Sequence, residues 1–531
     1  MAPSADFISI IKDIEYIQGI KAAGITQKYP DEVYIDIEEK SFAKLCFGLH
    51  QRFNSPVRML FAQDERSVTG KFVIYCVFLS TEFKKWFFVR LNIDGKSPKF
   101  PSLAKEIYSA SLFEREIKEM FGIEPTGNPD LRRLKLHDEV WPDNNFPLRK
   151  DFKLSGIKEA VKNNYKFVRI EGEGIFEVPV GPVHAGIIGP GHFRFSAAGE
   201  PIINLEARLG FTHKGVEKLF EDRDLKSAVM LSECISGDSA FSYSAAFCHS
   251  VEKILNLNVP EQALYIRGIF LELERMYNHV ADIAGIAVDV GFIFPSMYAS
   301  IIKENILRLN EKLSGSRYLK NINLPGGVNV DFNGYRKDIL MKELSLILED
   351  FGELKKILFS SASFMDRVDK TGILKKNTAR DLGVSGLAAR ASGISLDLRK
   401  VFGSIYGNVK FNIIKEKQGD VLARLNVRCS EFEESSRLIK EFSKNLTENG
   451  FNRCNDIQPK EGFGLGYVES WRGPLLFWVA LDKNAHIERV KIVDPSFNNW
   501  QGLCYAVLGN IIPDFPVCNK SFNLSYSGND L

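Results

Sequence analysis

Four side chains able to hold protons or hard cations lie within seven residues: Glu233, Ser236, Asp238 and Ser239. A serine hydroxyl stays unionised near neutral pH and is a hard ligand, so it suits a soft metal poorly, because such a metal needs thiolates. The two carboxylates instead suit a proton path or a hard cation. The alternative for Asp238 is structural, as a helix N-cap or a hydrogen-bonded loop residue.

The cysteines do not supply the thiolates that these serines lack. Eight are present, at positions 46, 76, 234, 248, 429, 454, 504 and 518, and no two have C-x-x-C spacing. No metal-binding motif is therefore predicted. Cys234 precedes Ser236 by two residues, which is about 200° around a helix, so it does not replace that side chain.

Bulk composition bounds the class of protein. The chain has 531 residues, 45% of them hydrophobic, which predicts two or more domains with a real core. Lys and Arg number 69 against 67 Asp and Glu, so nucleic-acid binding is not expected to dominate. Charged residues interrupt the first 17 positions, no disulfide framework is visible, and no apolar run approaches the ~20 residues that span a bilayer. We expect a cytoplasmic chain that reaches the membrane through partners.

The elements that position these residues follow from periodicity. Strands are predicted at 33–38, 72–80 and 85–93 and a helix at 41–53, which makes residues 1–152 a small α+β domain. A lysine-rich stretch with Ser, Gly and Asn predicts a linker over 153–171. Residues 172–531 begin with a short β region and continue as long helices. Residues 420–445 are predicted as a strand followed by a helix. The overall fold class is α+β.

The segment Phe113–Phe152, FEREIKEMFGIEPTGNPDLRRLKLHDEVWPDNNFPLRKDF, closely resembles the signature of the C subunit of NADH-quinone oxidoreductase (complex I). Its motifs are E-R-E, F-G-I, P-D-L-R-R and P-L-R-K-D-F, and Asn128 stands where the family has histidine. Glu114, Arg115, Glu116 and Glu119 are interpreted as helical charges for pairing between subunits.

The rest of the chain resembles the D subunit of complex I and the large subunit of group 4 [NiFe] hydrogenases of the hydrogenase-4 and formate hydrogenlyase type. The matching pieces include GPVHAGIIGPGHFRF (181–195), LGFTHKGVEKL (209–219), RGIFLELERMYNHVADIAGIAVDVG (267–291) and GVSGLAARASGISLDLRK (383–400). The fused order of the two modules is that of the same large subunits. The resemblance implies a mainly helical second domain.

The same resemblance marks four positions where those hydrogenases hold nickel through cysteine. They are occupied here by Ser236, Ser239, Ser525 and Gly528. Hydroxyls and a glycine lack the charge and polarisability of thiolates, so hydrogen activation by this chain is not expected. We predict no metal bound by this chain.

The relation to the D subunit of complex I implies a quinone site in the same cavity. By resemblance the residues that would face a quinone are His184, His192 and Tyr243, with Asp289 as a supporting carboxylate. A histidine backed by a carboxylate is a plausible proton donor to a reduced quinone. Arg472, in ESWRG, matches an arginine that overlooks the hydrogenase site. Glu233, Asp238, Asp289 and Arg472 are the candidate catalytic residues, and a structural role is the alternative for each.

These observations predict a subunit in the cytoplasmic arm of a membrane-bound, complex-I-like oxidoreductase. The resemblance implies a small iron–sulfur subunit and antiporter-like membrane subunits as partners, with the iron–sulfur cluster in the partner and a quinone or another acceptor in the emptied cavity. The chain has no nucleotide-binding glycine loop, which argues against direct NADH oxidation. A non-catalytic scaffold and a true hydrogenase remain as alternatives.

Overall fold

Five strands form the sheet of the N-terminal domain in the order β1-β2-β5-β4-β3. The computed structural model describes residues 5–155, 165–185, 188–332, 334–447, 453–454 and 457–531. The strands are β1 (Gly24–Tyr29), β2 (Glu32–Ile37), β3 (Met59–Glu65), β4 (Lys71–Ser80) and β5 (Lys85–Asp94). The sheet is antiparallel except for the β2–β5 pair. The strands and the helix predicted for this domain are confirmed.

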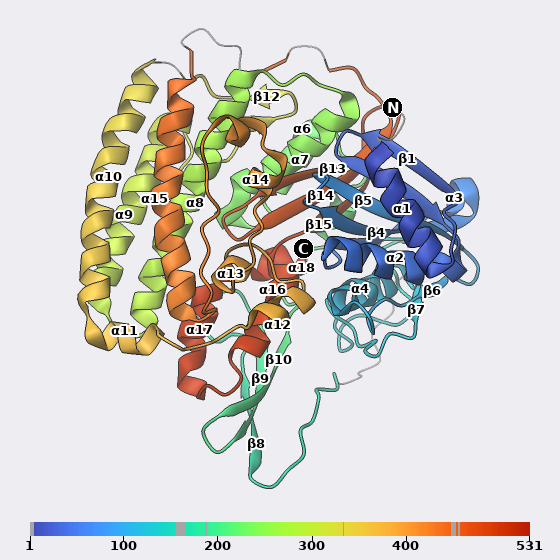
Figure 1. Cartoon of the computed structure of the whole chain (residues 1–531), viewed down its shortest axis with the longest axis horizontal. Helices are drawn as coiled ribbons and strands as arrows, with labels where there is room; N and C mark the ends of the chain where they lie inside the picture. Colours follow the sequence, from blue (N-terminus) through green and yellow to red (C-terminus); the bar gives the residue numbers. More distant parts are fainter. Residues whose placement is uncertain (1–4, 156–164, 186–187, 333, 448–452, 455–456) are drawn as a thin grey trace.

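Helices α1 (Ala5–Gln18) and α2 (Glu39–Phe53) pack beside this sheet (Figure 1). Phe61 and Tyr75 of the sheet contact Trp478, which belongs to a second sheet in the other half of the chain. Lys253 joins the halves again, because its ammonium lies 2.6 Å from Glu32 and 2.8 Å from Asp31. The two modules therefore share one hydrophobic core.

The charged signature of the first module lies on α4 (Ser111–Phe121) and the loop that follows it. Glu119 accepts backbone N–H groups from residues 134–136, and Arg115 donates to the carbonyl oxygens of residues 132 and 133. Glu116 contacts Lys135 at 2.7 Å and Lys491 at 2.6 Å. The expectation that these charges pair with other subunits is wrong, since they are buried and satisfied within the chain.

The second module begins with a three-stranded sheet that projects from the body of the molecule (Figure 1). Its strands are β8 (Ile175–Val180), β9 (His192–Ala198) and β10 (Ile202–Arg208). A second antiparallel sheet, β13 (Gly462–Glu469), β14 (Pro474–Leu481) and β15 (Ile487–Val493), lies between the N-terminal domain and the helices. The short pairs are β6 (Lys99–Pro101) with β7 (Glu124–Thr126) and β11 (Asn323–Leu324) with β12 (Gly327–Val328).

Four long helices stand side by side on the far side of the second sheet (Figure 1). They are α8 (Glu261–Asp289), α9 (Ile293–Ser314), α10 (Gly334–Ser360) and α15 (Val421–Lys444). The apolar face predicted for α8 is buried, including Ile266, Leu273 and Val280. The strand predicted near residue 420 is wrong, because α15 is helical from Val421, with Asp420 as its N-cap.

Shorter helices close the space around the site. They are α5 (Val216–Leu219), α6 (Leu225–Ser232), α7 (Ala240–Leu255), α11 (Ala362–Val368), α12 (Lys376–Asp381), α13 (Gly386–Ala391), α14 (Leu398–Phe402), α16 (Ser496–Ala506), α17 (Phe515–Phe522) and α18 (Tyr526–Asp530), with α3 (Arg66–Thr69) in the first module. The α+β class is confirmed. The described helices include none that is both long and apolar enough to cross a bilayer. Part of the predicted linker, 156–164, lies outside the described residues.

Candidate functional site

The four positions that resemble hydrogenase nickel ligands meet in space although 289 residues separate Ser236 from Ser525. The hydroxyl oxygens of these two serines are 2.9 Å apart. Ser239 directly precedes α7, and Gly528 lies one helical turn after Ser525, whose hydroxyl accepts the Gly528 N–H at 2.9 Å. The 236–239 segment and the 525–528 segment thus form one polar cluster.

Arg472 and Asp238 form an ion pair at the centre of this cluster. The guanidinium donates to both carboxylate oxygens, at 2.6 and 3.0 Å, and also to the Asn523 carbonyl oxygen at 2.7 Å. Both serine hydroxyls, of Ser236 and Ser239, donate to the same carboxylate. Burial opposes ionisation of Asp238, but the Arg472 charge outweighs it and lowers the pKa of the carboxyl.

Gly528 is closed to a larger side chain. A Cβ atom there would lie 2.7 Å from an Asp494 carboxylate oxygen and 2.8 Å from the Tyr243 hydroxyl. These two groups hydrogen-bond each other at 2.7 Å. The space for a fourth thiolate is therefore occupied by a buried tyrosine–aspartate pair.

A cavity of about 580 Å³ opens beside the cluster. Its wall includes Ser236, Asp238, Arg472, Ser525, His184 and Asp289, together with Lys520 and Tyr526. The His184 ring nitrogen Nε2 lies 3.0 Å from the Tyr526 hydroxyl. The glycines of the 181–191 loop make this approach possible, because a Cβ at Gly189 or Gly191 would lie within 3 Å of the Tyr526 ring.

Burial shifts the pKa of two groups on the cavity wall in opposite directions. Burial lowers the pKa of His184, so its imidazole is neutral near neutral pH. Burial raises the pKa of Asp289 at the end of α8, and the charge of Lys520 on the same wall opposes that shift. The wall thus combines a neutral histidine, a tyrosine hydroxyl, a carboxyl and an ammonium around one space.

Three of the predicted site residues lie away from this cavity. Glu233 does not line the cavity, and its carboxylate accepts the Asn321 N–H at 2.9 Å. Glu233 and Asp238 therefore do not form the expected pair of carboxylates along the cavity. His192 starts β9 and packs on Phe167. Tyr243 is fully buried behind Gly528 and is not on the cavity wall.

Tyr526 and Lys520 were missed by the sequence reasoning. Tyr526 directly follows Ser525, so its position next to a former ligand was the available signal. No sequence signal marked Lys520, because its approach to the cavity depends on its side chain crossing Gly285 of α8.

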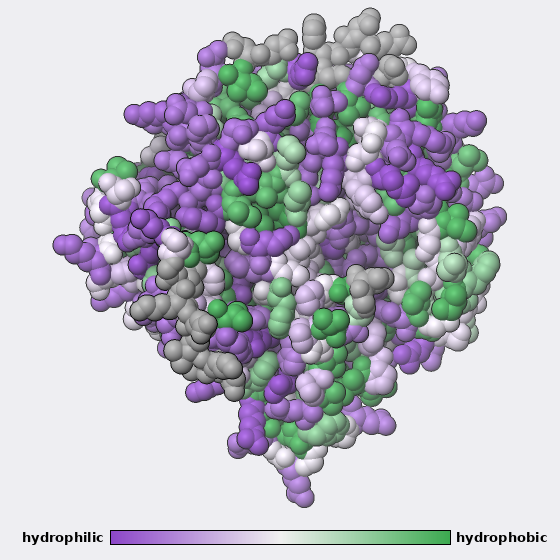
Figure 2. Space-filling model, turned by 180° about the vertical axis from the view of Figure 1, so that it is seen from behind, coloured by the Kyte–Doolittle hydropathy of each residue, from purple (hydrophilic) through white to green (hydrophobic). Residues whose placement is uncertain are grey.

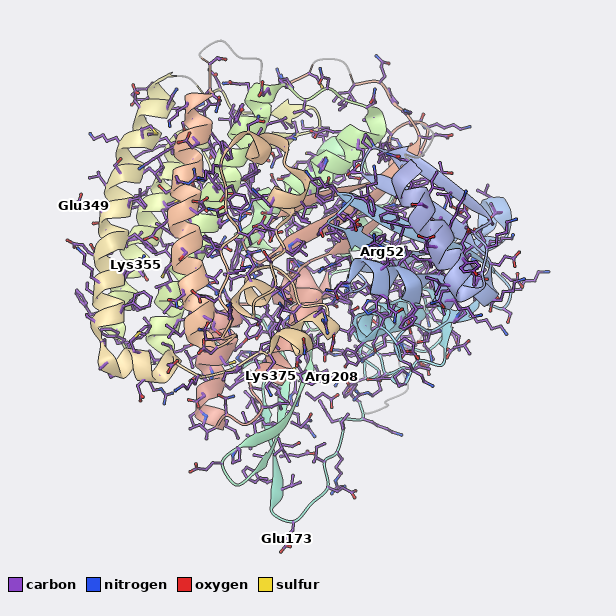
Figure 3. All side chains as sticks on the ribbon, in the orientation of Figure 1. Arg52, Glu173, Arg208, Glu349, Lys355 and Lys375 are labelled. Carbon is purple, nitrogen blue, oxygen red and sulfur yellow. The ribbon has the colours of Figure 1, made fainter. Side chains whose placement is uncertain are left out.

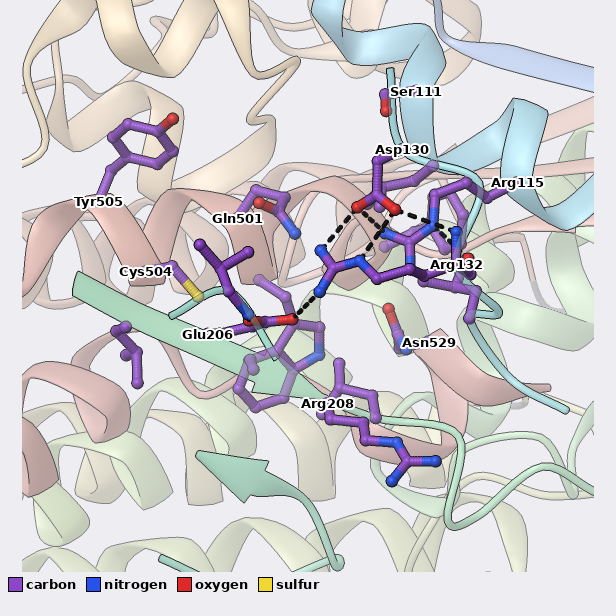
Figure 4. A pocket seen from close by; sticks show the side chains of 18 of the residues that line it. Ser111, Arg115, Asp130, Arg132, Glu206, Arg208, Gln501, Cys504, Tyr505 and Asn529 are labelled. Carbon is purple, nitrogen blue, oxygen red and sulfur yellow. Dashed lines mark hydrogen bonds and ion pairs between the residues drawn. The ribbon is translucent and has the colours of Figure 1, made fainter. Parts of the chain in front are cut away.

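A second cavity, of about 440 Å³, lies between the two modules (Figure 4). Arg132 bridges them there, since it binds Asp130 of the first module at 2.7 Å and Glu206 of β10 at 2.6 Å. Figure 3 shows Arg208 near the base of the projecting hairpin, and it pairs with Glu139 at 2.5 Å. Because these arginines are already paired, the contacts around this cavity serve to join the modules.

The residues of the cluster do not fit a nickel–iron centre. Their hydroxyls are engaged with each other and with Asp238, and the fourth position cannot carry a side chain without displacing Asp494 and Tyr243. In the described part of the chain, no three His, Cys, Asp or Glu side chains gather as a metal-binding group. The cluster offers hydrogen bonds and proton exchange instead.

Comparison with known proteins identifies the two modules. Residues 35–158 match the family model of the respiratory-chain NADH dehydrogenase 30 Kd subunit, and residues 289–460 match that of the 49 Kd subunit. This defines the class: a 30 Kd-type module fused to a 49 Kd-type module.

Three relatives place the chain within that class. It is 31% identical to hydrogenase-4 component G of Escherichia coli over 94% of this chain and 88% of that protein, and 31% identical to formate hydrogenlyase subunit 5 of the same organism over 94% and 89%. It is 28% identical to the C/D 1 subunit of NADH-quinone oxidoreductase of Aquifex aeolicus over 85% and 83%. The chain therefore belongs to the complex I C/D family that includes hydrogenase-4 component G and formate hydrogenlyase subunit 5.

A solved structure has the same fold. A chain from the structure of the membrane-bound sulfane sulfur reductase, an archaeal respiratory membrane complex, superposes with a TM-score of 0.63 and is 25% identical. The match covers 68% of this chain and 99% of that one.

Proposed function

We propose that this chain is the acceptor-site subunit in the cytoplasmic arm of a membrane-bound, complex-I-like oxidoreductase. Electrons from an iron–sulfur partner subunit reach a quinone or another small acceptor in the cavity at the former nickel position, and the reaction is coupled to ion movement by membrane subunits. The family relationship supports an oxidoreductase subunit of a membrane complex. The observation that carries the acceptor assignment is the cavity wall formed by His184, Tyr526 and the Asp238–Arg472 pair.

The chemistry of that wall suits an acceptor that becomes more basic on reduction. His184 and Tyr526 lie on the wall, and their mutual hydrogen bond uses one of their two protons, so either the ring N–H or the O–H is left to donate to an acceptor oxygen. When the acceptor gains electrons, its oxygen gains negative charge, and these donors stabilise it. Asp289, whose pKa burial raises, lies on the same wall as a carboxyl that can exchange a proton with the acceptor.

Quinone reductase activity of the purified complex tests this assignment. Loss of one hydrogen bond of about 1.4 kcal/mol predicts a roughly tenfold lower kcat/KM for His184→Gln and for Tyr526→Phe. His192→Gln and Tyr505→Phe are the matched controls, because neither residue lines the cavity. Equal activity of all four variants would show that the acceptor binds elsewhere.

The alternatives give different results in the same preparation. A scaffold predicts an assembled complex in which no variant changes electron transfer and no acceptor is reduced. A true hydrogenase predicts stoichiometric nickel in the purified complex and hydrogen-dependent electron transfer.

The start of α9 supports a membrane subunit as partner. Ile293, Phe294, Met297 and Ile301 are 56–66% exposed and recur along one side of the helix. This apolar strip begins four residues after Asp289 of the cavity wall, and the next charged residue is Lys303. Figure 2 shows further hydrophobic side chains gathered toward the lower end of the molecule, where the β8–β9 hairpin projects.

Assembly tests this partner. Met297→Glu with Ile301→Glu places two charges in the strip, and we expect the chain to fold but to lose the membrane subunits on purification. Leu346→Glu on α10 is the control, because Leu346 is equally exposed at 55% but is not part of the strip. Retention of the membrane subunits by the double variant would refute this surface.

A further inference from the structure

A cluster of buried charges lies where α8, α13, α14 and α15 meet the end of β13. Its members share direct ion pairs and are at most 6% exposed: Glu272, Asp397, Glu431, Glu469, Arg275, Arg390 and Arg399. It contains four carboxyl groups and three guanidinium groups, so the carboxyl groups cannot each have a guanidinium group of their own. Buried charges need partners, and the least-paired acid is the one expected to hold a proton.

Glu469 is that acid. It has one close cation, Arg390 at 2.7 Å, and one backbone donor, the Leu398 N–H at 3.1 Å. Glu272, by contrast, contacts Arg399 at 2.9 Å and Arg275 at 3.1 Å and accepts two hydroxyls. Burial and the neighbouring Asp397 raise the pKa of Glu469 to about 7, whereas Arg399 and Arg275 overcome burial and lower the pKa of Glu272 to about 2.

The groups that face Glu469 come from four directions. Arg390 lies on α13, and Asp397 lies just before α14. Arg275 of α8 donates to the Glu469 backbone carbonyl at 2.7 Å, and Arg58, from the N-terminal domain, acts on Glu469 through its charge.

Glu469 also lines a cavity of its own, of about 310 Å³. Apolar side chains, including Leu398, Phe402 and Ile405, form much of its wall, and exposed Ser404 is at its rim. This cavity shares no lining residue with the acceptor cavity, and of the buried cluster it is lined by Glu469 and Arg399.

A tight turn, residues 469–473, connects the two cavities. Ser470 and Gly473 close it with two backbone hydrogen bonds, of 2.8 and 3.1 Å, and Arg275 holds the carbonyl oxygens of residues 469 and 470. At the far end of the turn the Trp471 indole donates to Ser239 at 3.0 Å, and Arg472 binds Asp238. The turn therefore forms a continuous chain of contacts from Glu469 to the Asp238–Arg472 pair.

We propose that Glu469 is a proton-exchange site, open to solvent through the cavity at Ser404, and that the 469–473 turn transmits its charge state to the Asp238–Arg472 pair. Protonation removes one of the two carboxylates that contact Arg390, which keeps Glu431 at 2.8 Å, and so weakens the anchor of the turn. A role for this proton exchange in the reduction of an acceptor rests on the proposed function. The titration of Glu469 and its effect on the Asp238–Arg472 pair do not.

Fluorine NMR of the full chain labelled with fluorotryptophan tests the proposal. The chain has five tryptophans, and Trp471→Phe assigns the resonance of Trp471. We expect this resonance to shift between about pH 5 and about pH 9 with a midpoint near 7. The shift is lost in Glu469→Gln and is kept in Glu461→Gln, which alters an exposed residue at the other end of β13.

A nearby acid needs its own control. Burial raises the pKa of Glu274 to about 8, and its carboxylate acts on Asp238. Glu274→Gln is expected to leave the midpoint near 7 unchanged. A Trp471 resonance that does not move in the wild-type chain overturns the proposal, and so does one that moves alike in Glu469→Gln. The first of these outcomes overturns it even if Glu469→Gln does not fold. Quinone reduction is not measured, so failure here leaves the proposed function to its own test.

Discussion

Gly528→Ala tests whether the fourth ligand position is closed. The new Cβ atom would lie 2.7–2.8 Å from both members of the Tyr243–Asp494 pair, distances that real Cβ contacts do not reach. The pair must separate or the C-terminal helix α18 must move. The first response breaks the buried Tyr243–Asp494 hydrogen bond, and the second pulls Ser525, the N-cap of α18, away from Ser236.

The size of the effect follows from these contacts. Losing a hydrogen bond to a charged, buried partner costs about 2 kcal/mol, and crowding a packed site adds about 2 kcal/mol. Alanine in place of glycine within a helix recovers up to about 1 kcal/mol. A net destabilisation of about 3 kcal/mol is therefore expected around Gly528.

Hydrogen–deuterium exchange of the intact chain measures this locally, which suits a chain of several modules. About 3 kcal/mol corresponds to roughly 100-fold faster exchange in the peptides of α17 and α18. Gly237→Ala is the matched control, because its Cβ would meet no atom within 4 Å although Gly237 lies next to another former ligand position. Adding Tyr243→Phe should recover part of the loss, since it removes one of the two obstructing atoms. Unchanged exchange in Gly528→Ala would refute the closed position, and nickel binding could then be rebuilt with four cysteines.

Three further predictions concern charge. Because the raised pKa of Glu274 keeps a proton on the folded chain, this group makes stability fall as the pH rises from about 5 to about 8, by up to ~1.4 kcal/mol per pH unit. Glu274→Gln removes this contribution from the slope measured by thermal unfolding, and an unchanged slope would contradict the raised pKa. Lys253→Met leaves Glu32 buried without its cation and should destabilise the junction of the modules by about 3 kcal/mol. Lys355→Met, which breaks a more exposed ion pair, should change stability by less than about 1 kcal/mol. Equal effects of the two variants on stability would contradict the role of Lys253. Asp238→Asn isolates the buried Arg472 charge, so exchange in α7 should rise by at least about tenfold, whereas unchanged exchange would show that the pair is not stabilising.

The sequence by itself determined the modules, most of the elements and the loss of thiolates. Strand alternation at 33–38 and 85–93 and the apolar face of α8 follow from local chemistry, so the N-terminal sheet and the bundle helix were predictable. The wrong strand prediction near residue 420 has a local cause too, because α15 begins with Val421 and Leu422, an apolar pair that does not by itself distinguish a strand from a helix capped by Asp420.

Which side chains face the cavity was decided only by the tertiary structure. Glu233 and Asp238 are five residues apart, yet one turns to the Asn321 backbone and the other to Arg472, because each takes the partner that the fold brings within reach. The Tyr526–His184 contact joins segments 342 residues apart, and the buried Tyr243 hydroxyl donates to Asp494, 251 residues further along the chain. Residue type fixes what a group can donate or accept, but its partner depends on long-range packing that local sequence does not encode.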